Sequence, residues 1–169
     1  MTVLSKIEET IPSLRRYASA LLGGRQDADD LVHDCLVLAL AHIKPRMTES
    51  EVRPWLFTII RNHFISGRRK IVARGTSIDI DEAAALMPAT APVQEQRMQM
   101  HELSKGLAAL PDDQREVFLL ITLEGFEYAE VAAMLGIPLG TVMSRLSRAR
   151  DHLRDFMDGR ARPALRRVK

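Results

Sequence analysis

Four short or cationic side chains near the end of the chain have the types and spacing that suit contacts with DNA. They share one side of an expected helix, on which each residue turns about 100°: Thr141, Ser144, Arg145 and Arg148. Hydroxyl groups near a helix axis can reach base edges in the major groove, and arginines bind guanine edges or phosphates. We therefore interpret this face as a candidate surface for duplex DNA.

The stretch Glu127–Arg150 predicts the element that would position this face, two helices joined by a tight turn. Gly136 suits a left-handed helix end, and Pro138 suits the first position of the next helix. Apolar residues at helical spacing give each helix an inner face, in the first at Tyr128, Val131, Ala132 and Leu135 and in the second at Leu139, Val142, Leu146 and Ala149. An ordinary amphipathic helix pair would share this inner pattern. The outer face favours DNA binding, because it carries no acidic residue before Asp151.

The composition favours a helical protein. The 169 residues suffice for one domain or two small ones, and 46% of them are apolar while only 5% are aromatic. Runs of β-branched residues with period two are missing, and Ala, Leu, Arg and Glu dominate. We predict an all-α fold.

Charge is distributed unevenly although the net charge is only +2. Residues 139–169 contain nine Lys or Arg against three acidic residues, whereas residues 71–96 contain one cation against four acids. Such segregation predicts a polyanionic partner at the C-terminal end and a different environment in the middle.

Several classes of function find no support in the sequence. It contains no glycine-rich phosphate loop, no Cys/His set with metal-ligand spacing and no nucleophile motif, so we expect neither an enzyme nor a cofactor or metal site. His33 and Cys35 fall on different faces of a helix, which disfavours a metal site there. The single cysteine excludes an internal disulfide, and no run approaches the roughly eighteen apolar residues of a membrane span. We expect a cytoplasmic protein without membrane insertion.

Residues 71–93 interrupt the helical pattern with two prolines, an alanine-rich patch and three closely spaced acidic residues. We predict a flexible acidic linker there. It would join two small helical bundles at residues 1–70 and 94–169, the second of which contains the helix-turn-helix. An extended linker of this length could span roughly 70–80 Å, enough for the bundles to bind well-separated sites.

Proline and aspartate suggest where the first helices begin. Pro12 would start the first helix after a weakly patterned segment, because the first turn of a helix tolerates the missing N–H. Asp27 suits the N-cap of the next helix. Pro54 would start the third, after a polar loop at Lys44–Arg53.

The second expected helix carries a mixed stripe on the side away from its core face. Asp30 and Asp34 align there with the small apolar residues Val37 and Ala41. A purely solvated face would carry longer and more highly charged side chains. The stripe is either a docking surface for a basic helical partner or a plain surface, and the residues alone leave both interpretations open.

The helix expected after Pro54 combines aromatic residues with an amide and a basic end, in the order Trp55, Phe57, Asn62, Arg68 and Arg69. Bases stack on aromatic rings, an amide can read a base edge and cations hold the backbone, so this set suits single-stranded nucleic acid. A core helix whose basic last turn complements the helix dipole would give the same pattern.

Four segments follow one another over nearly the whole chain: DADDLVHDCLVLAL (Asp27–Leu40), WLFTIIRN (Trp55–Asn62), LPDDQREVFLL (Leu110–Leu120) and GFEYAEVAAMLGIPLGTVMSRLSRAR (Gly125–Arg150). Together they resemble a bacterial sigma factor of the extracytoplasmic-function group, which keeps only regions two and four of the sigma-70 family. The last motif is the most specific. The run IPSLRRYASAL (Ile11–Leu21) is similar to the general-stress sigma factors of alphaproteobacteria.

The resemblance implies a non-catalytic, stress-response protein that directs core RNA polymerase to specific promoters and helps to melt the −10 element. Its implied partners are promoter DNA, the β′ clamp helices and β flap of core polymerase, and an anti-sigma factor. The second helix of the pair would lie in the major groove of the −35 element. Ser144 and Arg148 are expected nearest the bases, and Thr141 and Arg145 at the sides, on phosphates.

The first half carries the other two implied sites. One would capture a flipped base of the melted −10 element, and its candidate residues are Met47, Arg53, Asn62, Arg68 and Arg69. The other would bind the β′ clamp helices, through Asp30, Asp34 and Val37. Both sites are implied by the resemblance and lie on segments that the motifs cover or adjoin.

A stand-alone helix-turn-helix regulator is the alternative hypothesis. It would need the recognition helix but would give no role to Asp30, Asp34 and Asn62, and it would usually dimerise on a palindromic site. A protein-interaction module that has lost DNA binding is a third hypothesis. The intact cationic outer face argues against that one.

Overall fold

The structure, a computed structural model, describes residues 2–23, 25–74 and 94–159. Every regular element in these ranges is helical, so the all-α prediction is confirmed. In chain order the elements are α1 (Val3–Leu22), α2 (Arg25–Ala41), α3 (Glu49–Arg74), α4 (Gln94–Ala109), α5 (Asp112–Phe118), the π-helical turn η2 (Leu119–Leu123), α6 (Tyr128–Leu135) and α7 (Leu139–Met157).

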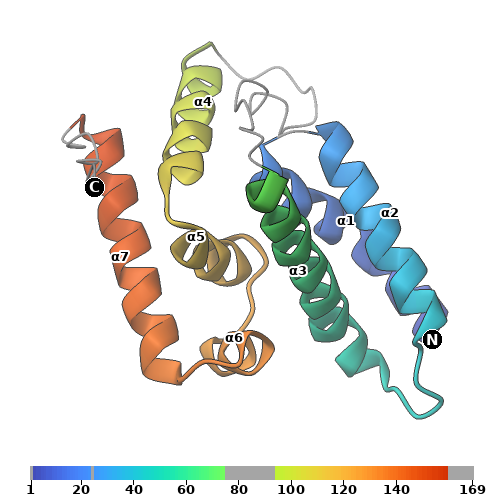
Figure 1. Ribbon diagram of the computed structural model, residues 1–169. Helices are drawn as coiled ribbons and strands as arrows, with labels where there is room; N and C mark the ends of the chain where they lie inside the picture. Colours follow the sequence, from blue (N-terminus) through green and yellow to red (C-terminus); the bar gives the residue numbers. More distant parts are fainter. Residues whose placement is uncertain (1, 24, 75–93, 160–169) are drawn as a thin grey trace.

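The helices form two groups that lie side by side (Figure 1). Helices α1, α2 and α3 pack against one another, and α7 packs against α4, α5 and α6. The groups meet where α6 contacts α3 and η2 contacts α1. Helix α3 continues to Arg74, and residues 75–93 of the predicted linker lie outside the described residues.

The buried core is continuous between the two groups. Side chains of α1 and α3 share one apolar cluster with side chains of the second group, including Tyr17, Leu56, Phe57, Leu120, Phe126, Val131 and Leu146. The aromatic rings form a chain through it, because Phe57 lies edge-on to both Tyr17 and Phe126, at centroid distances of 5.2 and 5.1 Å. The two groups are therefore joined by packing as well as by the chain.

The first helix begins earlier than Pro12, at Val3. The hydroxyl of Thr2 accepts a hydrogen bond from the backbone N–H of Ser5 and so caps the helix, while Pro12 lies inside it. Asp27 likewise lies within the first turn of α2 rather than at its N-cap, where its charge still complements the helix dipole.

The third helix also begins before the proline expected to start it. Thr48 precedes the helix, and the carboxylate of Glu51 accepts both its backbone N–H and its hydroxyl at 2.8 Å. This local pair starts α3 at Glu49, so residues 49–53 are helical and not part of a loop. Pro54 lies inside the helix.

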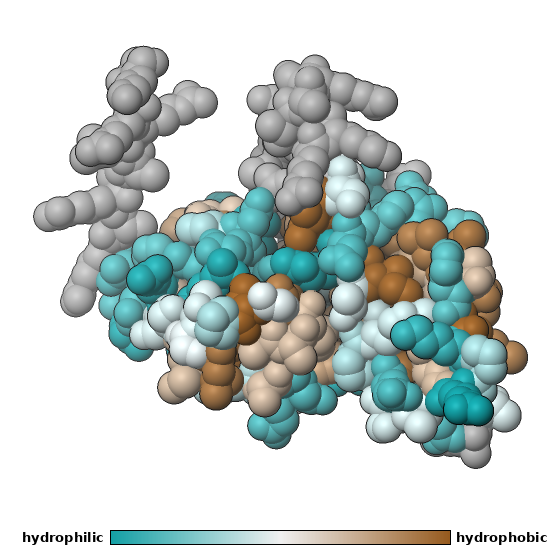
Figure 2. All heavy atoms as spheres, turned by 60° about the horizontal axis from the view of Figure 1, so that its bottom comes forward, coloured by the Kyte–Doolittle hydropathy of each residue, from teal (hydrophilic) through white to brown (hydrophobic). Residues whose placement is uncertain are grey.

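No single helix in the described ranges is both long and apolar enough to cross a membrane, and α6 with α7 meets that test only as a pair bent by 106°. On the face in Figure 2, apolar surface is divided into patches by hydrophilic side chains. Large exposed apolar side chains include Val37, Leu38 and Leu40 on α2 and Leu139 and Met143 on α7.

Candidate nucleic-acid interface

The helix pair predicted at residues 127–150 is present as α6 and α7. Glu127 and Glu130 form a capping box, in which the Glu130 carboxylate accepts the backbone N–H of Glu127 at 2.8 Å. Gly136 ends α6 with a φ of 63°, the left-handed conformation that its position predicted. Pro138 is the N-cap of α7 and not its first helical residue, because its ψ of 148° is extended.

The inner face of α7 is shorter than predicted. Val142, Leu146 and Ala149 are buried, but Leu139 remains 48% exposed. Leu139 is the first residue of the helix and lies beside Met143, one turn further on, which is 52% exposed. The start of α7 therefore extends past the core and presents two apolar side chains to solvent.

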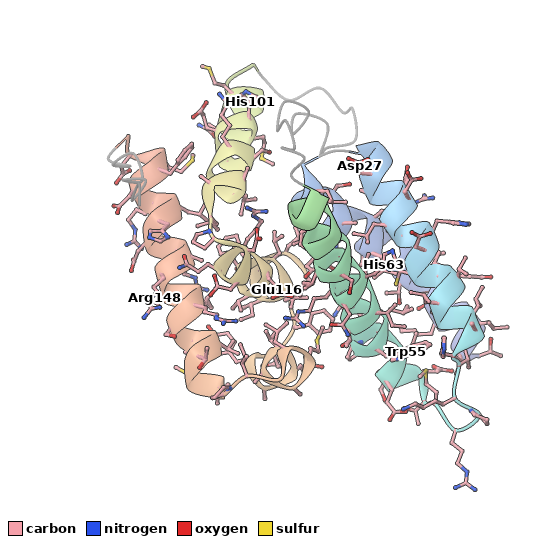
Figure 3. The ribbon with its side chains drawn as sticks, viewed as in Figure 1. Asp27, Trp55, His63, His101, Glu116 and Arg148 are labelled. Atoms are coloured by element: carbon pink, nitrogen blue, oxygen red, sulfur yellow. The ribbon has the colours of Figure 1, made fainter. Side chains whose placement is uncertain are left out.

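The outer face of α7 divides into two exposed and two half-buried side chains. Ser144 and Arg148 are exposed, whereas Thr141 and Arg145 are half-buried. The Ser144 hydroxyl donates to the Thr141 carbonyl at 3.1 Å, and Arg145 Nε lies 3.2 Å from a carboxylate oxygen of Asp113 on α5. Arg148 points away from both helix groups (Figure 3). Ser144 and Arg148, the two residues predicted nearest the bases, are thus the more exposed pair, and their role stays a prediction.

A buried arginine that the sequence analysis did not single out holds α4 against α5. Arg115 donates to the carbonyls of Leu107, Ala108 and Leu110, at 2.7–2.9 Å, and to that of Leu21 at 3.3 Å. Carbonyls at a helix end have no partner within the helix, so a guanidinium is well suited to satisfy them. Arg115 thereby stabilises the support on which α7 packs.

The predicted −10 residues lie in different environments on the first helix group. Met47 is half-buried against the core, whereas Asn62 is exposed and its side-chain oxygen accepts from Arg61 at 3.3 Å. Arg53 is directed towards the second helix group. The side chains of Arg68 and Arg69 lie outside the described residues, although α3 passes through them.

Arg61 connects Asn62 to the second group through an ion pair with Glu116 of α5. Burial raises the pKa of the Glu116 carboxyl, and the hydrogen bond from Arg61 opposes that rise. Figure 3 shows Glu116 between α5 and α3. The middle of α3, at Arg61 and Asn62, is thus partly engaged by the second group.

The stripe on α2 is exposed along its length. Asp30 and Asp34 are exposed, and Val37 is 54% exposed. His63 of α3 lies 3.1 Å from the Asp34 carboxylate, so this acid is tied to the neighbouring helix. Two more apolar side chains, Leu38 and Leu40, extend the surface beyond the residues predicted for it.

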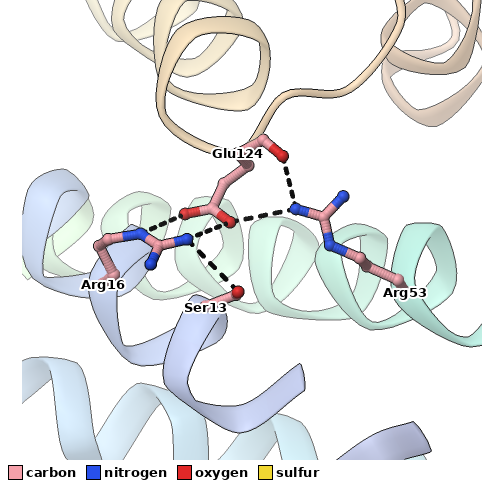
Figure 4. A network of polar contacts seen from close by, with 4 residues as sticks. All are labelled: Ser13, Arg16, Arg53 and Glu124. Carbon is pink, nitrogen blue, oxygen red and sulfur yellow. Dashed lines mark hydrogen bonds and ion pairs between the residues drawn. The ribbon is translucent and has the colours of Figure 1, made fainter. Parts of the chain in front are cut away.

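A further polar cluster joins the groups and was not predicted. The side chain of Glu124, at the end of η2, has no solvent exposure and lies between Arg16 and Arg53 (Figure 4). Arg16 binds both carboxylate oxygens, at 3.1 and 3.0 Å. Arg53 Nη2 donates to the Glu124 carbonyl at 2.6 Å and to its carboxylate at 3.2 Å. The partners lie 108 and 71 residues away in the chain, so no local pattern could reveal them.

Comparison with known proteins agrees with these two helix groups. A family described as "Sigma2 domain of PhyR" matches residues 7–61, and one described as "Sigma-70, region 4" matches residues 100–153. The two helix groups thus match two regions of the sigma-factor family.

The curated relatives give the family. The chain is 41% identical over 143 residues to the ECF RNA polymerase sigma factor EcfG of Rhodopseudomonas palustris, which covers 85% of this chain and 78% of the relative. It is 32% identical over 134 residues to the ECF RNA polymerase sigma factor SigC of Mycobacterium tuberculosis, over 79% and 72% of the two chains. The chain belongs to the extracytoplasmic-function (ECF) sigma factors of RNA polymerase, as its motifs predicted.

Solved structures share the arrangement. The sigma factor RpoE in its complex with the anti-sigma factor NepR from Bartonella quintana is 33% identical, with a TM-score of 0.74 over 91% of this chain and 95% of that one. The PhyR–NepR complex from Sphingomonas sp. Fr1 is similar in fold, with a TM-score of 0.69 at 19% identity.

Proposed function

We propose that this chain directs core RNA polymerase to specific promoters and assists the melting of their −10 element. The observation that carries the proposal is the presence of two separate exposed surfaces in one sigma-family chain. One is the cationic outer face of α7, and the other is the acidic and apolar stripe on α2. A stand-alone regulator needs only the first of them.

In this proposal α7 reads the −35 element. Ser144 and Arg148 are exposed at the centre of the face and contact base edges. Thr141 and Arg145 are half-buried and lie at the sides of the face, where they bind phosphates and fix the register of the helix on the duplex. Asp113 holds the guanidinium of Arg145 in place for that contact.

The first helix group reads the melted −10 strand and carries the polymerase contact. The strand is held by Met47, Arg53, Asn62, Arg68 and Arg69. The β′ clamp helices dock on α2 through Asp30, Asp34 and Val37, which offer charge and apolar surface to a basic helical partner. The second helix group contacts the β flap.

The protein works in the cytoplasm and has no catalytic activity of its own. Its regulation is through an anti-sigma factor of the kind that the similar RpoE binds in its complex with NepR. The proposal includes a role in stress response, because the run at Ile11–Leu21 is similar to the general-stress sigma factors of alphaproteobacteria.

Run-off transcription with purified core polymerase tests the proposal. We expect a specific transcript from a cognate promoter only when the chain is added. A lack of any chain-dependent transcript would refute a sigma function, and tight binding of the free chain to a palindromic duplex would favour the stand-alone regulator instead.

Asp34→Arg tests the docking stripe separately. The substitution reverses a charge on the exposed surface of α2, so we expect weaker binding to core polymerase with the helical content unchanged. Glu8→Arg, at an exposed position of α1, makes the same change of charge away from the stripe and serves as the control. Normal holoenzyme assembly by Asp34→Arg would remove Asp34 from the docking site.

A further inference from the structure

The contact between the two helix groups contains a carboxylate whose side chain is fully buried. Glu124 lies fully out of solvent, yet its partners Arg16 and Arg53 keep 48% and 31% of their side chains exposed. A buried carboxylate is stable only when it is paired and hydrogen-bonded, and here the pairing comes from the other helix group. Glu124 therefore has its polar partners only while the groups are together.

Local backbone geometry delivers Glu124 to this position. The π-helical turn η2 ends at Leu123, and the N–H of Glu124 still bonds to the carbonyl of Leu119 at 3.0 Å. Gly125 follows with a φ of 70°, which reverses the chain before α6. The turn therefore projects Glu124 from the second group towards α1 and α3 (Figure 4).

Apolar packing and a second ion pair support the same contact. The Arg53 guanidinium lies over the ring of Phe126, 4.1 Å from its centroid, and Phe126 packs edge-on against Phe57. Further along α3, Arg61 binds the buried carboxylate of Glu116. Two arginines of one helix are thus held by two acids of the other group.

Arg53 belongs to the surface proposed to hold the melted −10 strand, and Arg61 binds Asn62 of the same surface. The Arg53 guanidinium that would meet a phosphate is thus occupied by the Glu124 carboxylate, and the Glu116 carboxylate holds Arg61 next to the exposed Asn62. We propose that Glu124, together with Glu116, acts as an internal substitute for nucleic-acid anions and keeps the first helix group of the free protein closed to single-stranded DNA. This inference rests on the proposed function and adds a regulatory contact within the chain to it.

One buried polar group lowers the free-energy cost of separating the helix groups. The hydroxyl of Tyr17 is buried in the shared core and, within the described residues, has no hydrogen-bond partner. Burial raises the pKa of that hydroxyl well above its ordinary value; the negative charges of Glu116 and Glu124 add to the rise, and the positive charge of Arg61 opposes it. Separation of the groups would hydrate this hydroxyl and the three charged side chains. The free energy of that hydration would offset part of the apolar packing lost.

Glu124→Gln tests the contact, because it removes the charge but keeps the shape of the side chain. Fluorophores on Ser66→Cys and Asp155→Cys, at exposed sites on α3 and α7, would report the separation of the groups by energy transfer. The buried thiol of Cys35 has its pKa raised to about 12, so labelling at neutral pH stays selective for the introduced cysteines. We expect Glu124→Gln to raise the population of separated chains about tenfold or more.

The second readout is binding of the free chain to a single-stranded oligonucleotide with the non-template −10 sequence of the promoter used for run-off transcription. We expect Glu124→Gln to bind it more tightly than the unsubstituted chain, by a similar factor. Glu8→Gln makes the same chemical change at an exposed site and should alter neither readout. If Glu124→Gln does not fold, Arg16→Gln removes the same pair from the other side, at a half-exposed residue outside the proposed −10 site.

The outcomes separate this inference from the proposed function. Two results would overturn the internal contact as an inhibitor: unchanged energy transfer in a variant that folds, or separation of the groups without tighter DNA binding. A chain-dependent transcript would still uphold the sigma function in either case. Loss of the transcript from the unsubstituted chain would overturn the function itself. Greater separation together with tighter binding supports the inference.

Discussion

The two candidate DNA surfaces of this protein both contain arginine, but Arg148 on one and Arg53 on the other lie in different environments. On α7, Arg148 is exposed and directed away from the rest of the protein (Figure 3). On α3, Arg53 is bound to a carboxylate and a carbonyl and lies over an aromatic ring. Arg148 is thus exposed to solvent, whereas Arg53 is engaged by the second helix group, although Asn62 on the same helix remains exposed.

This difference indicates an order of events. Under the proposed function and internal contact, Arg148 is accessible to duplex DNA in this arrangement, whereas Arg53 becomes available to the −10 strand when the helix groups separate. Separation also exposes the shared apolar core, so it requires a partner whose binding free energy offsets the lost hydrophobic stabilisation. Core polymerase, which would bind both groups, is suited to supply that free energy.

Phe126→Ala should have the largest effect, because it acts on the covered surface. Phe126 is buried between the groups, packs on Phe57 and lies under Arg53. Truncation of a buried Phe usually costs about 3–5 kcal/mol, so we expect a loss of that order in the free energy of unfolding. Chemical denaturation of the full chain measures it, and the energy-transfer pair should report separated groups. A loss below about 1 kcal/mol would mean that the groups hardly depend on each other.

Arg148→Ala should have a smaller effect, confined to the open surface. If Arg148 contacts a base edge, we expect binding to the −35 duplex to weaken by about 1–3 kcal/mol with the contact between the helix groups unchanged. Holoenzyme binding to a promoter series with substituted −35 positions measures this. Arg145→Ala is the informative comparison, because Asp113 already engages that guanidinium and a phosphate contact should weaken all sequences alike. An unaltered promoter profile for Arg148→Ala would contradict base contact.

The smallest expected effect is a dependence on pH that comes from Glu116. Because burial raises its pKa in the folded state, the folded chain binds this proton more tightly than the unfolded chain. The contribution is fully present below the ordinary carboxyl pKa and is lost as pH rises through the raised value. We expect the free energy of unfolding of the unsubstituted chain to fall relative to that of Glu116→Gln as pH rises from the ordinary carboxyl pKa through the raised value. Parallel pH profiles for the two proteins would contradict this.

The helix-turn-helix could be read from the sequence because its signals are local. A glycine at a left-handed helix end and an apolar residue every third or fourth position depend only on neighbours within a few residues. For that reason Gly136, Val142 and Leu146 lie as predicted. Leu139 does not, since the periodic pattern cannot tell where the partner surface ends.

Helix starts were less predictable where two local signals competed. Pro12 and Pro54 indicated starts, but the side chains of Thr2 and Thr48 bond in the first turns of α1 and α3 further upstream. A capping hydrogen bond starts the helix wherever it forms, and a proline within the next turns is tolerated once the remaining helix is packed.

The sequence by itself determined the helical class, the recognition helix and the family, because all three depend on periodicity, caps and contiguous motifs. Only the tertiary structure decided that Arg148 is exposed while Arg53 is engaged between the helix groups. Glu124 meets Arg16 and Arg53 across separations of 108 and 71 residues. Nothing in the neighbouring sequence distinguishes this buried glutamate from an exposed one. Burial between two helix groups selects those partners, since a carboxylate out of contact with water must be paired wherever the fold places it.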